Sequence, residues 1–219
     1  SQAAYDLYMR GAYLFHRRGA ASIRRAIGLF QQAVAADPSY ARAYAALGAA
    51  LSVLPAWSDT PGDSTLPPAL AAADKAIGLD GTLAEAHAAR GGVLQGLYRW
   101  DDAVQALRRA TELDPHYATA FQWLGEAYHS TGRMDESLAA YKRATELDEW
   151  SAVAWGNAAI VQCAAGQQKE GLASYRRAVD LTRIQVAPLE RRNAHTGADH
   201  QIVVVENRGK CLVQFHLRA

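Results

Sequence analysis

Residues 118–151 decide the fold: ATAFQWLGEAYHSTGRMDESLAAYKRATELDEWS. Each half of this stretch places apolar residues three or four positions apart: Phe121, Leu124 and Tyr128, then Leu138, Tyr141 and Ala144. Such spacing is typical of amphipathic helices. Gly132 lies between the two halves, where a helix can end and the chain can turn. The stretch therefore predicts two helices joined by a tight turn.

The same pattern recurs every 34 residues, earlier and later in the chain, without a gap. The spacing is visible at three sets of positions: Gly91 and Gly125; Ala110, Ala144 and Ala178; Leu113, Leu147 and Leu181. A fixed period of this length indicates stacked helical units, none of which can bury its apolar face alone. Two modified copies, with Gly11 and Gly48, precede these. We expect five repeats within residues 1–185, at 4–40, 41–83, 84–117, 118–151 and 152–185.

Two segments depart from the pattern. Residues 52–68 form a proline-rich insert in the second repeat, which cannot be one continuous helix. From Val186 the helical period stops, so residues 186–219 form a non-repeat tail. Within this tail, Gln201–Glu206 and Cys211–Leu217 are rich in β-branched residues and alternate in polarity, which predicts the two strands of a β-hairpin. A solenoid usually ends in a polar capping helix, and none is visible. The chain also begins with Ser1 and not Met. We therefore expect either that both ends are cut from a larger protein or that the tail belongs to a different context.

The repeat resembles the tetratricopeptide repeat, whose pattern is W-x2-L-G-x2-Y, then A-x3-F, then P. The matching positions are Phe121, Leu124, Gly125, Tyr128, Ser137, Tyr141 and Ala144. The resemblance implies an all-α fold, a right-handed superhelical solenoid of helix–turn–helix repeats with an irregular C-terminal tail. Residues 4–38 also resemble, more weakly, the repeat region of bacterial multidomain regulators. In those proteins it accompanies a winged-helix transcriptional regulator, adenylate cyclase or serine/threonine kinase domain.

In tetratricopeptide arrays the first helix of each repeat lines a concave groove that receives a partner. Mapped by register, the resemblance implies a groove that includes Tyr8, Arg42, Glu85, Gln122, Trp123, Glu126, His129 and Asn157. Trp123 fits a packing residue equally well. Small residues on the same face should leave open backbone between them: Ala45, Ala49, Ala88, Gly92 and Gly96. One subclass clamps a C-terminal carboxylate with Lys, Asn and Arg, but this chain has few such residues at these positions, so no clamp is expected.

Three basic pairs share one register: Arg108-Arg109, Lys142-Arg143 and Arg176-Arg177. Acidic residues follow four positions after the first member of each pair: Glu112, Glu146 and Asp180. This arrangement favours a solvated, salt-bridged ridge. A stripe that binds anions or nucleic acid is the alternative.

The rest of the sequence argues against catalysis. No phosphate loop, HExxH, nucleophile elbow or CxxC is present. His195 and His200 lack the spacing of metal ligands, so we expect no metal, no cofactor and no enzyme. The formal net charge of +1 gives no field to attract nucleic acid. No run is long enough to span a membrane. There are only two cysteines, and we interpret Cys163 as a small buried residue of a cytoplasmic protein.

These observations predict a protein–protein interaction scaffold that binds a peptide or helix in its groove. The resemblance to multidomain regulators implies the sensory or regulatory segment of a larger bacterial protein. Two alternatives stay open. The chain could be the non-catalytic repeat segment of a glycosyltransferase-type enzyme, or a module that self-associates through its uncapped last repeat.

Overall fold

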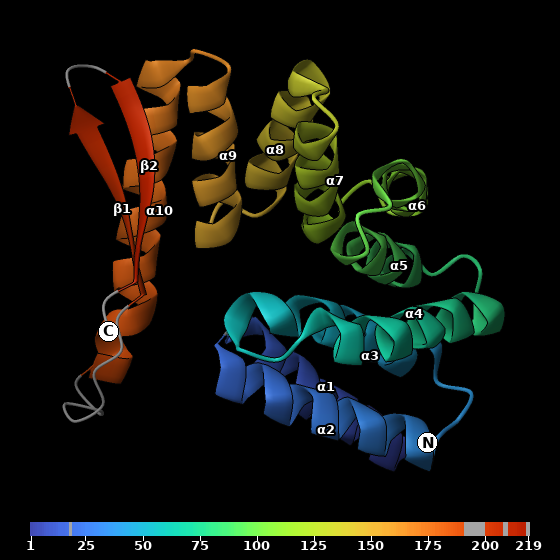
Figure 1. Ribbon diagram of the computed structural model, residues 1–219. Helices are drawn as coiled ribbons and strands as arrows, with labels where there is room; N and C mark the ends of the chain where they lie inside the picture. Colours follow the sequence, from blue (N-terminus) through green and yellow to red (C-terminus); the bar gives the residue numbers. More distant parts are fainter. Residues whose placement is uncertain (18, 191–199, 208–209, 218–219) are drawn as a thin grey trace. The chain divides into compact units, whose positions relative to one another are not determined.

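The computed structural model describes residues 1–17, 19–190, 200–207 and 210–217, with side chains described for 1–17 and 19–184. These residues form ten α-helices, one short 3-10 helix and two strands (Figure 1). The helices are α1 (Gln2–His16), α2 (Ala20–Ala36), α3 (Ala41–Val53), η1 (Leu54–Trp57), α4 (Gly62–Leu79), α5 (Ala84–Gly96), α6 (Trp100–Leu113), α7 (Ala118–Ser130), α8 (Met134–Leu147), α9 (Ala152–Ala164) and α10 (Gln168–Glu190). The strands are β1 (His200–Asn207) and β2 (Lys210–Leu217).

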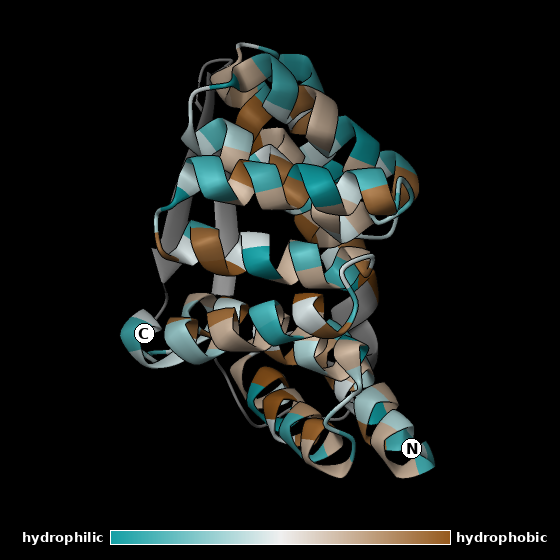
Figure 2. Cartoon of the chain, turned by 90° about the vertical axis from the view of Figure 1, so that its right-hand side faces the viewer, coloured by the Kyte–Doolittle hydropathy of each residue, from teal (hydrophilic) through white to brown (hydrophobic). Residues whose placement is uncertain are grey.

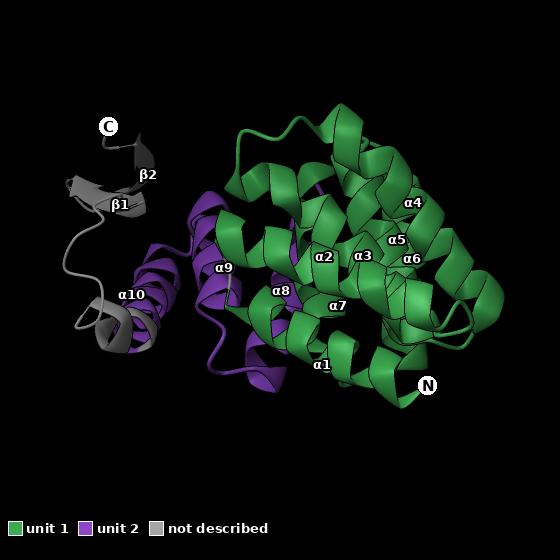
Figure 3. Cartoon of the chain, turned by 90° about the horizontal axis from the view of Figure 1, so that it is seen from below, with its two compact units in different colours: residues 1–131 green, residues 132–219 purple. Residues whose placement is uncertain are grey.

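The chain divides into two compact units, residues 1–131 and 132–219 (Figure 3). In the first unit, α1 packs on α2, α3 on α4 and α5 on α6, and each hairpin contacts the next. In the second unit, α8 contacts α9, and α9 packs on α10. The predicted all-α solenoid of helical hairpins is therefore confirmed.

In the first and third hairpins, a bulky side chain of the second helix packs on a glycine of the first helix. Hydrophobic and hydrophilic residues are interspersed along every helix (Figure 2). A Cβ atom on Gly11 would lie 2.6 Å from the ring of Phe30, and a Cβ on Gly91 would overlap Leu107. Phe30 and Leu107 are fully buried. Gly lowers helix propensity by roughly 1 kcal/mol relative to Ala, and the close packing offsets that cost.

An aspartate ends the second helix of four hairpins. Its carboxylate accepts a hydrogen bond from the backbone N–H two residues later, at 2.8–3.1 Å: Asp37 from Ser39, Asp80 from Thr82, Asp114 from His116 and Asp148 from Trp150. The side chain thus forms a local turn that stops the helix and directs the chain into the next one. At Asp80, hydrogen bonds from the Thr82 hydroxyl and N–H hold the pKa of the carboxyl below its usual value.

The turns inside the last three hairpins use a left-handed backbone residue. Gly132 and Gly166 have φ of 75° and 80°. Tyr98 occupies the equivalent position in the third repeat, 34 residues before Gly132, and it also has a positive φ, 58°. Its side chain is 80% exposed and touches only the edge of Trp100 among the described aromatic rings. A residue with a Cβ is disfavoured in this conformation.

Tyr98→Gly is expected to raise the free energy of unfolding by about 0.5–1 kcal/mol, because the relief of left-handed strain exceeds the entropic cost of Gly. Urea denaturation measures the change. Tyr98→Ala is the control, since it removes the ring but keeps the Cβ. An equal gain from the alanine variant would show that the ring, rather than the backbone, is the source of strain.

The insert of the second repeat is less irregular than its composition indicates. The helical path does break, at η1 and residues 58–61, as predicted. However, α4 begins at Gly62 and contains both Pro67 and Pro68, so the last part of the insert is helical. Pro67 and Pro68 have no backbone N–H, so the carbonyls of Asp63 and Ser64 lack their helical hydrogen-bond donors. All four residues are exposed, and water can hydrate these carbonyls instead. Leu66 is buried and anchors the segment.

The tail contains more helix than expected. α10 continues past residue 185 to Glu190, so the predicted boundary falls inside a helix. β1 and β2 then pair antiparallel, with His200 opposite Leu217 and Asn207 opposite Lys210. This is the predicted hairpin. His195 lies outside the described residues.

Candidate functional site

The first helices of successive hairpins in unit 1 contact one another, α1 with α3, α3 with α5, and α5 with α7. They therefore form a continuous surface, which we call the first-helix surface. Three predicted groove residues meet on it: Tyr8, Arg42 and Glu85. The Arg42 Nε atom lies 3.8 Å from Glu85 Oε1. The Tyr8 ring packs edge-on against Tyr40, with centroids 5.4 Å apart.

The two charged side chains act on the Tyr8 phenol in opposite directions. Burial raises the pKa of the Tyr8 phenol, the Glu85 carboxylate raises it further, and Arg42 opposes this effect. The Arg42 and Glu85 side chains stay 61% and 38% exposed. Both charges are therefore accessible to a partner. Separating this exposed ion pair would cost at most about 1 kcal/mol.

On α7, two predicted groove residues are buried. Trp123 is 7% exposed, and its ring atoms lie 3.1 Å from the position of a Cβ on Gly92. Its backbone carbonyl accepts a 2.7 Å hydrogen bond from the buried Gln95 amide. Trp123 is therefore a packing residue. Gln122 is 8% exposed, so its side chain is buried and does not lie open in a groove.

Two further α7 residues face a different environment. Glu126 is exposed, yet surrounding protein atoms strip part of its hydration, and this desolvation raises the pKa of its carboxyl. No cation pairs with Glu126 among the ion pairs of the described residues. His129 lies one turn further along α7 and is half-buried. Asn157 belongs to α9 of the second unit and is also half-buried.

We expected small residues to leave open backbone on this face, but at four of the five positions they do not, and the fifth, Ala49, is half-buried. Ala45 and Ala88 are fully or almost fully buried. Trp123 covers Gly92, and Leu66 covers Gly96, where a Cβ would lie 2.7 Å from the leucine side chain. These positions admit neighbouring helices, and the available contacts come from the polar side chains around them.

On α6 and on α8, the basic pair forms an ion pair with a glutamate of the same helix, as predicted. The arginine that takes part is the second member of the pair, not the first. The second arginine pairs with the glutamate three positions later: Arg109 with Glu112 at 3.4 Å, and Arg143 with Glu146 at 3.5 Å. In the third pair, the Arg177 guanidinium lies over the Trp150 ring, 5.5 Å from its centroid. Glutamates of the same helices therefore neutralise Arg109 and Arg143, as the salt-bridged interpretation predicts.

The part of the chain that the structure describes contains no group of three or more metal-ligating side chains. None of its helices is long and apolar enough to cross a lipid bilayer. Cys163 is half-buried and disulfide-bonded, so it is not the small buried residue that the sequence indicated. The other cysteine, Cys211, lies in β2, whose side chains are outside the described set.

The comparisons with known proteins agree with this geometry. Residues 83–152 match the tetratricopeptide repeat family. That segment carries tetratricopeptide repeats, and the fold is that of a tetratricopeptide repeat solenoid. A comparison with curated protein sequences gave no match.

Solved structures of this class resemble the chain over most of its length. The thermophilic TPR protein TTC0263 of Thermus thermophilus is 20% identical with a TM-score of 0.68, and the match covers 85% of this chain and 99% of that one. PilF of Pseudomonas aeruginosa is 18% identical, with a TM-score of 0.60 over 88% and 86% of the two chains. YrrB, described as a TPR protein with an unusual peptide-binding site, is 21% identical, with a TM-score of 0.50 over 84% and 90%. At these identities the likeness concerns the fold.

Proposed function

We propose that the chain is a protein-interaction scaffold that binds an extended peptide or a helix on its first-helix surface. The observation that carries the proposal is Glu126, an exposed but partly desolvated carboxylate without a cationic partner in the described residues. Leaving such a charge uncompensated is unfavourable. A basic side chain of the partner would compensate it.

The other charged residues of the surface support the same mode of binding. Arg42 and Glu85 are accessible and belong to two neighbouring first helices. A partner that lies across α3, α5 and α7 would meet charges of both signs, which fix its register and orientation. The helices already pack on each other, so the surface is preformed and little conformational entropy is lost on binding. The peptide-binding site of YrrB, a protein of the same fold, supports such a role.

The wider context is also a proposal. The weak resemblance of residues 4–38 to bacterial multidomain regulators supports a sensory or regulatory segment within a larger protein. In that setting the chain would recognise a partner and would not catalyse a reaction itself.

A peptide array tests the binding proposal. Extended peptides that carry Lys or Arg at a central position are compared with matched peptides that carry Glu, and we expect the full chain to prefer the basic set. Glu126→Gln should weaken the best binder by about 1–3 kcal/mol, as loss of a central contact does. Glu112→Gln on the basic ridge is the matched control and should leave affinity unchanged. Calorimetry measures both.

Two outcomes would reject the first-helix surface as the binding site. In one, Glu112→Gln or Arg109→Ala abolishes binding while Glu126→Gln retains it, which places recognition on the ridge. In the other, no peptide of the array binds saturably.

The raised pKa of Glu126 has its own consequence for stability. The folded chain holds the Glu126 proton more tightly than the unfolded chain does, so ionisation at neutral pH opposes folding. This penalty is full above the raised pKa and disappears as the pH falls below the unfolded-state value. Glu126→Gln is therefore expected to raise the unfolding midpoint in urea at pH 7 and to leave it unchanged at pH 3. A lower midpoint at pH 7 would show that the carboxylate is stabilised in the free protein.

A further inference from the structure

The turn inside the first hairpin carries a concentration of positive charge. Residues 7–36 contain five arginines and no aspartate or glutamate. Residues 1–40 have a formal side-chain charge of +3, from five arginines and two aspartates. Residues 41–131, the rest of the same compact unit, have a charge of −4, from six basic and ten acidic residues. The positive charge of this unit is therefore gathered in one hairpin.

Two later hairpins have an ion pair at the equivalent place. Counted back from the aspartate that ends each second helix, the twelfth residue is Asp102 in α6 and Glu136 in α8. Asp102 pairs with Arg99 and Glu136 pairs with Arg133, each at 2.6 Å. The equivalent residue of α2 is Arg25. A position that neutralises an arginine in the later hairpins thus adds a positive charge in the first one.

The geometry of the hairpin itself exposes this position. The side chains of Asp102 and Glu136 are 42% and 47% exposed, although other hairpins of the chain precede both of them. Arg25 is exposed as well, and so is Arg24 beside it. The accessibility of this position therefore belongs to the turn end of a hairpin in general.

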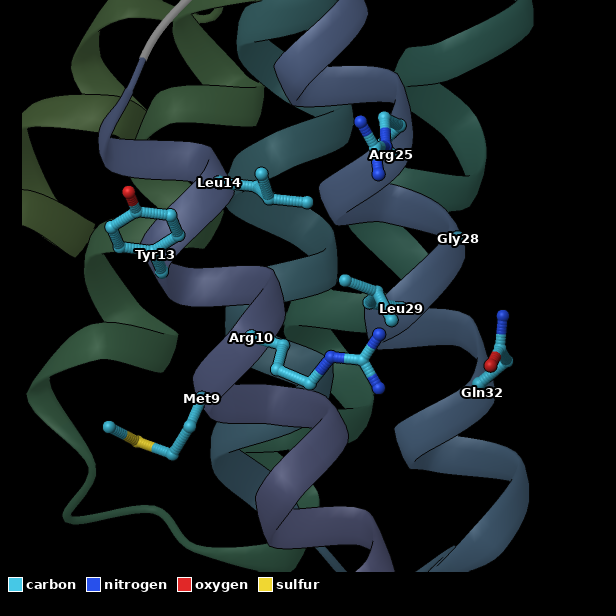
Figure 4. Close-up of a pocket in the computed structure, with 8 residues that line it drawn as sticks. All are labelled: Met9, Arg10, Tyr13, Leu14, Arg25, Gly28, Leu29 and Gln32. Atoms are coloured by element: carbon cyan, nitrogen blue, oxygen red, sulfur yellow. The ribbon is translucent and has the colours of Figure 1, made fainter.

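Uncharged groups hold two of the arginines near the first turn. The Arg17 guanidinium lies over the Tyr13 ring, 5.9 Å from its centroid. The Arg24 Nη2 atom donates a 3.3 Å hydrogen bond to the Thr60 hydroxyl. Figure 4 shows Arg25 on α2, across a pocket from Tyr13 on α1. We call Arg17, Arg24 and Arg25 the basic edge.

No carboxylate neutralises the basic edge within the described ranges. Asp59 adjoins Thr60 in the sequence, but none of the three arginines takes part in an ion pair there. Clustered charges of one sign repel each other, and they attract an ion of the opposite sign. A bound anion would therefore relieve the repulsion.

We propose that the basic edge binds an acidic segment of a partner protein, whose carboxylates pair with Arg24 and Arg25. The planar guanidinium of arginine suits bidentate pairing with carboxylates. A short segment meets only the positive hairpin. A nucleic acid or an anionic membrane is more extended, so it would also meet the negative charge of residues 41–131 and be repelled. This site is independent of Glu126, which attracts a basic side chain.

A polyglutamate peptide is the probe. The fluorescent peptide is titrated at low salt into the full 219-residue chain, and anisotropy reports saturable binding, whereas a glycine–serine peptide of equal length should not bind. Combining Arg24→Glu with Arg25→Glu should weaken the binding by about tenfold, as reversal of contacting charges does. The matched control combines Arg108→Glu with Arg109→Glu. It changes the net charge equally at an exposed pair on α6 and should leave the affinity unchanged.

A second variant guards against loss of the fold. Arg24→Gln combined with Arg25→Gln removes the two charges without reversing them, and it should also weaken the binding while circular dichroism stays unchanged.

Three results would overturn the proposal. The first is the absence of saturable binding by polyglutamate. The second is an equal loss of affinity in the α2 and α6 double variants, because the chain would then respond only to net charge. The third is tighter binding of an oligothymidylate, or of phosphatidylserine vesicles, than of polyglutamate at the same salt, with the same dependence on Arg24 and Arg25. The occupant would then be a nucleic acid or a membrane.

Discussion

Tyr141→Ala is expected to lower the free energy of unfolding by about 3–5 kcal/mol, since large-to-small changes of buried aromatic residues both lose transfer free energy and leave a cavity. Tyr141 is 3% exposed. It clusters with Ala158 and Val161 of α9, so the cavity would open between α8 and α9. Chemical denaturation measures the loss.

The matched control for this prediction is Lys142→Ala, which changes the next, exposed residue of the same helix. Exposed substitutions of this kind usually alter stability by less than about 0.5 kcal/mol. If Tyr141→Ala cost no more than the control, the contact between α8 and α9 would not depend on this ring. The assignment of the fourth repeat's register would then be wrong.

Leu107→Ala is expected to cost about 2–5 kcal/mol, because Leu107 is fully buried in the α5–α6 hairpin. Gly91→Ala alone should cost about 1–3 kcal/mol, since a Cβ there would overlap the Leu107 side chain. The two changes should not be additive. Once Leu107 is shortened, the new Cβ has room, and Gly91→Ala should cost much less.

A double-mutant cycle measured by urea denaturation reports this coupling. Equal costs of Gly91→Ala in the two backgrounds would contradict the close approach of α5 and α6 at this position. A gain in stability from Gly91→Ala alone would do so as well, because helix propensity would then outweigh the contact.

Much of the fold could be predicted because the 34-residue period carries the local chemistry of a hairpin. Gly91 and Leu107 illustrate this, since their spacing indicates both the helices and their contact. The extent of α4 could not be predicted in the same way. Pro67 and Pro68 normally end helices, but here they lie on an exposed side while Leu66 is buried, a compensation that depends on the tertiary structure.

The candidate site was harder to predict for a related reason. In a solenoid, a first helix is covered by its own hairpin and by the preceding one, so its accessible strip is narrow. Gln122 and Trp123 are buried, whereas Glu126 on the same helix is exposed. Trp123 is buried because its ring packs on Gly92 of the preceding hairpin. One signal was present in the sequence: Gly92 and Gly96 are small because other side chains occupy their space.

The aspartate turns between hairpins bear on how an array of this kind can change in length. Each turn is closed by a hydrogen bond that spans only two residues, so the corner is independent of the hairpins on either side. The additional residues of the second repeat lie between its two helices, and the corner at Asp80 keeps the same bond as the corner at Asp114. Whole hairpins could therefore be added or removed at these corners without a change in the turn itself. The length of the surface available to a partner would then change in steps of one hairpin.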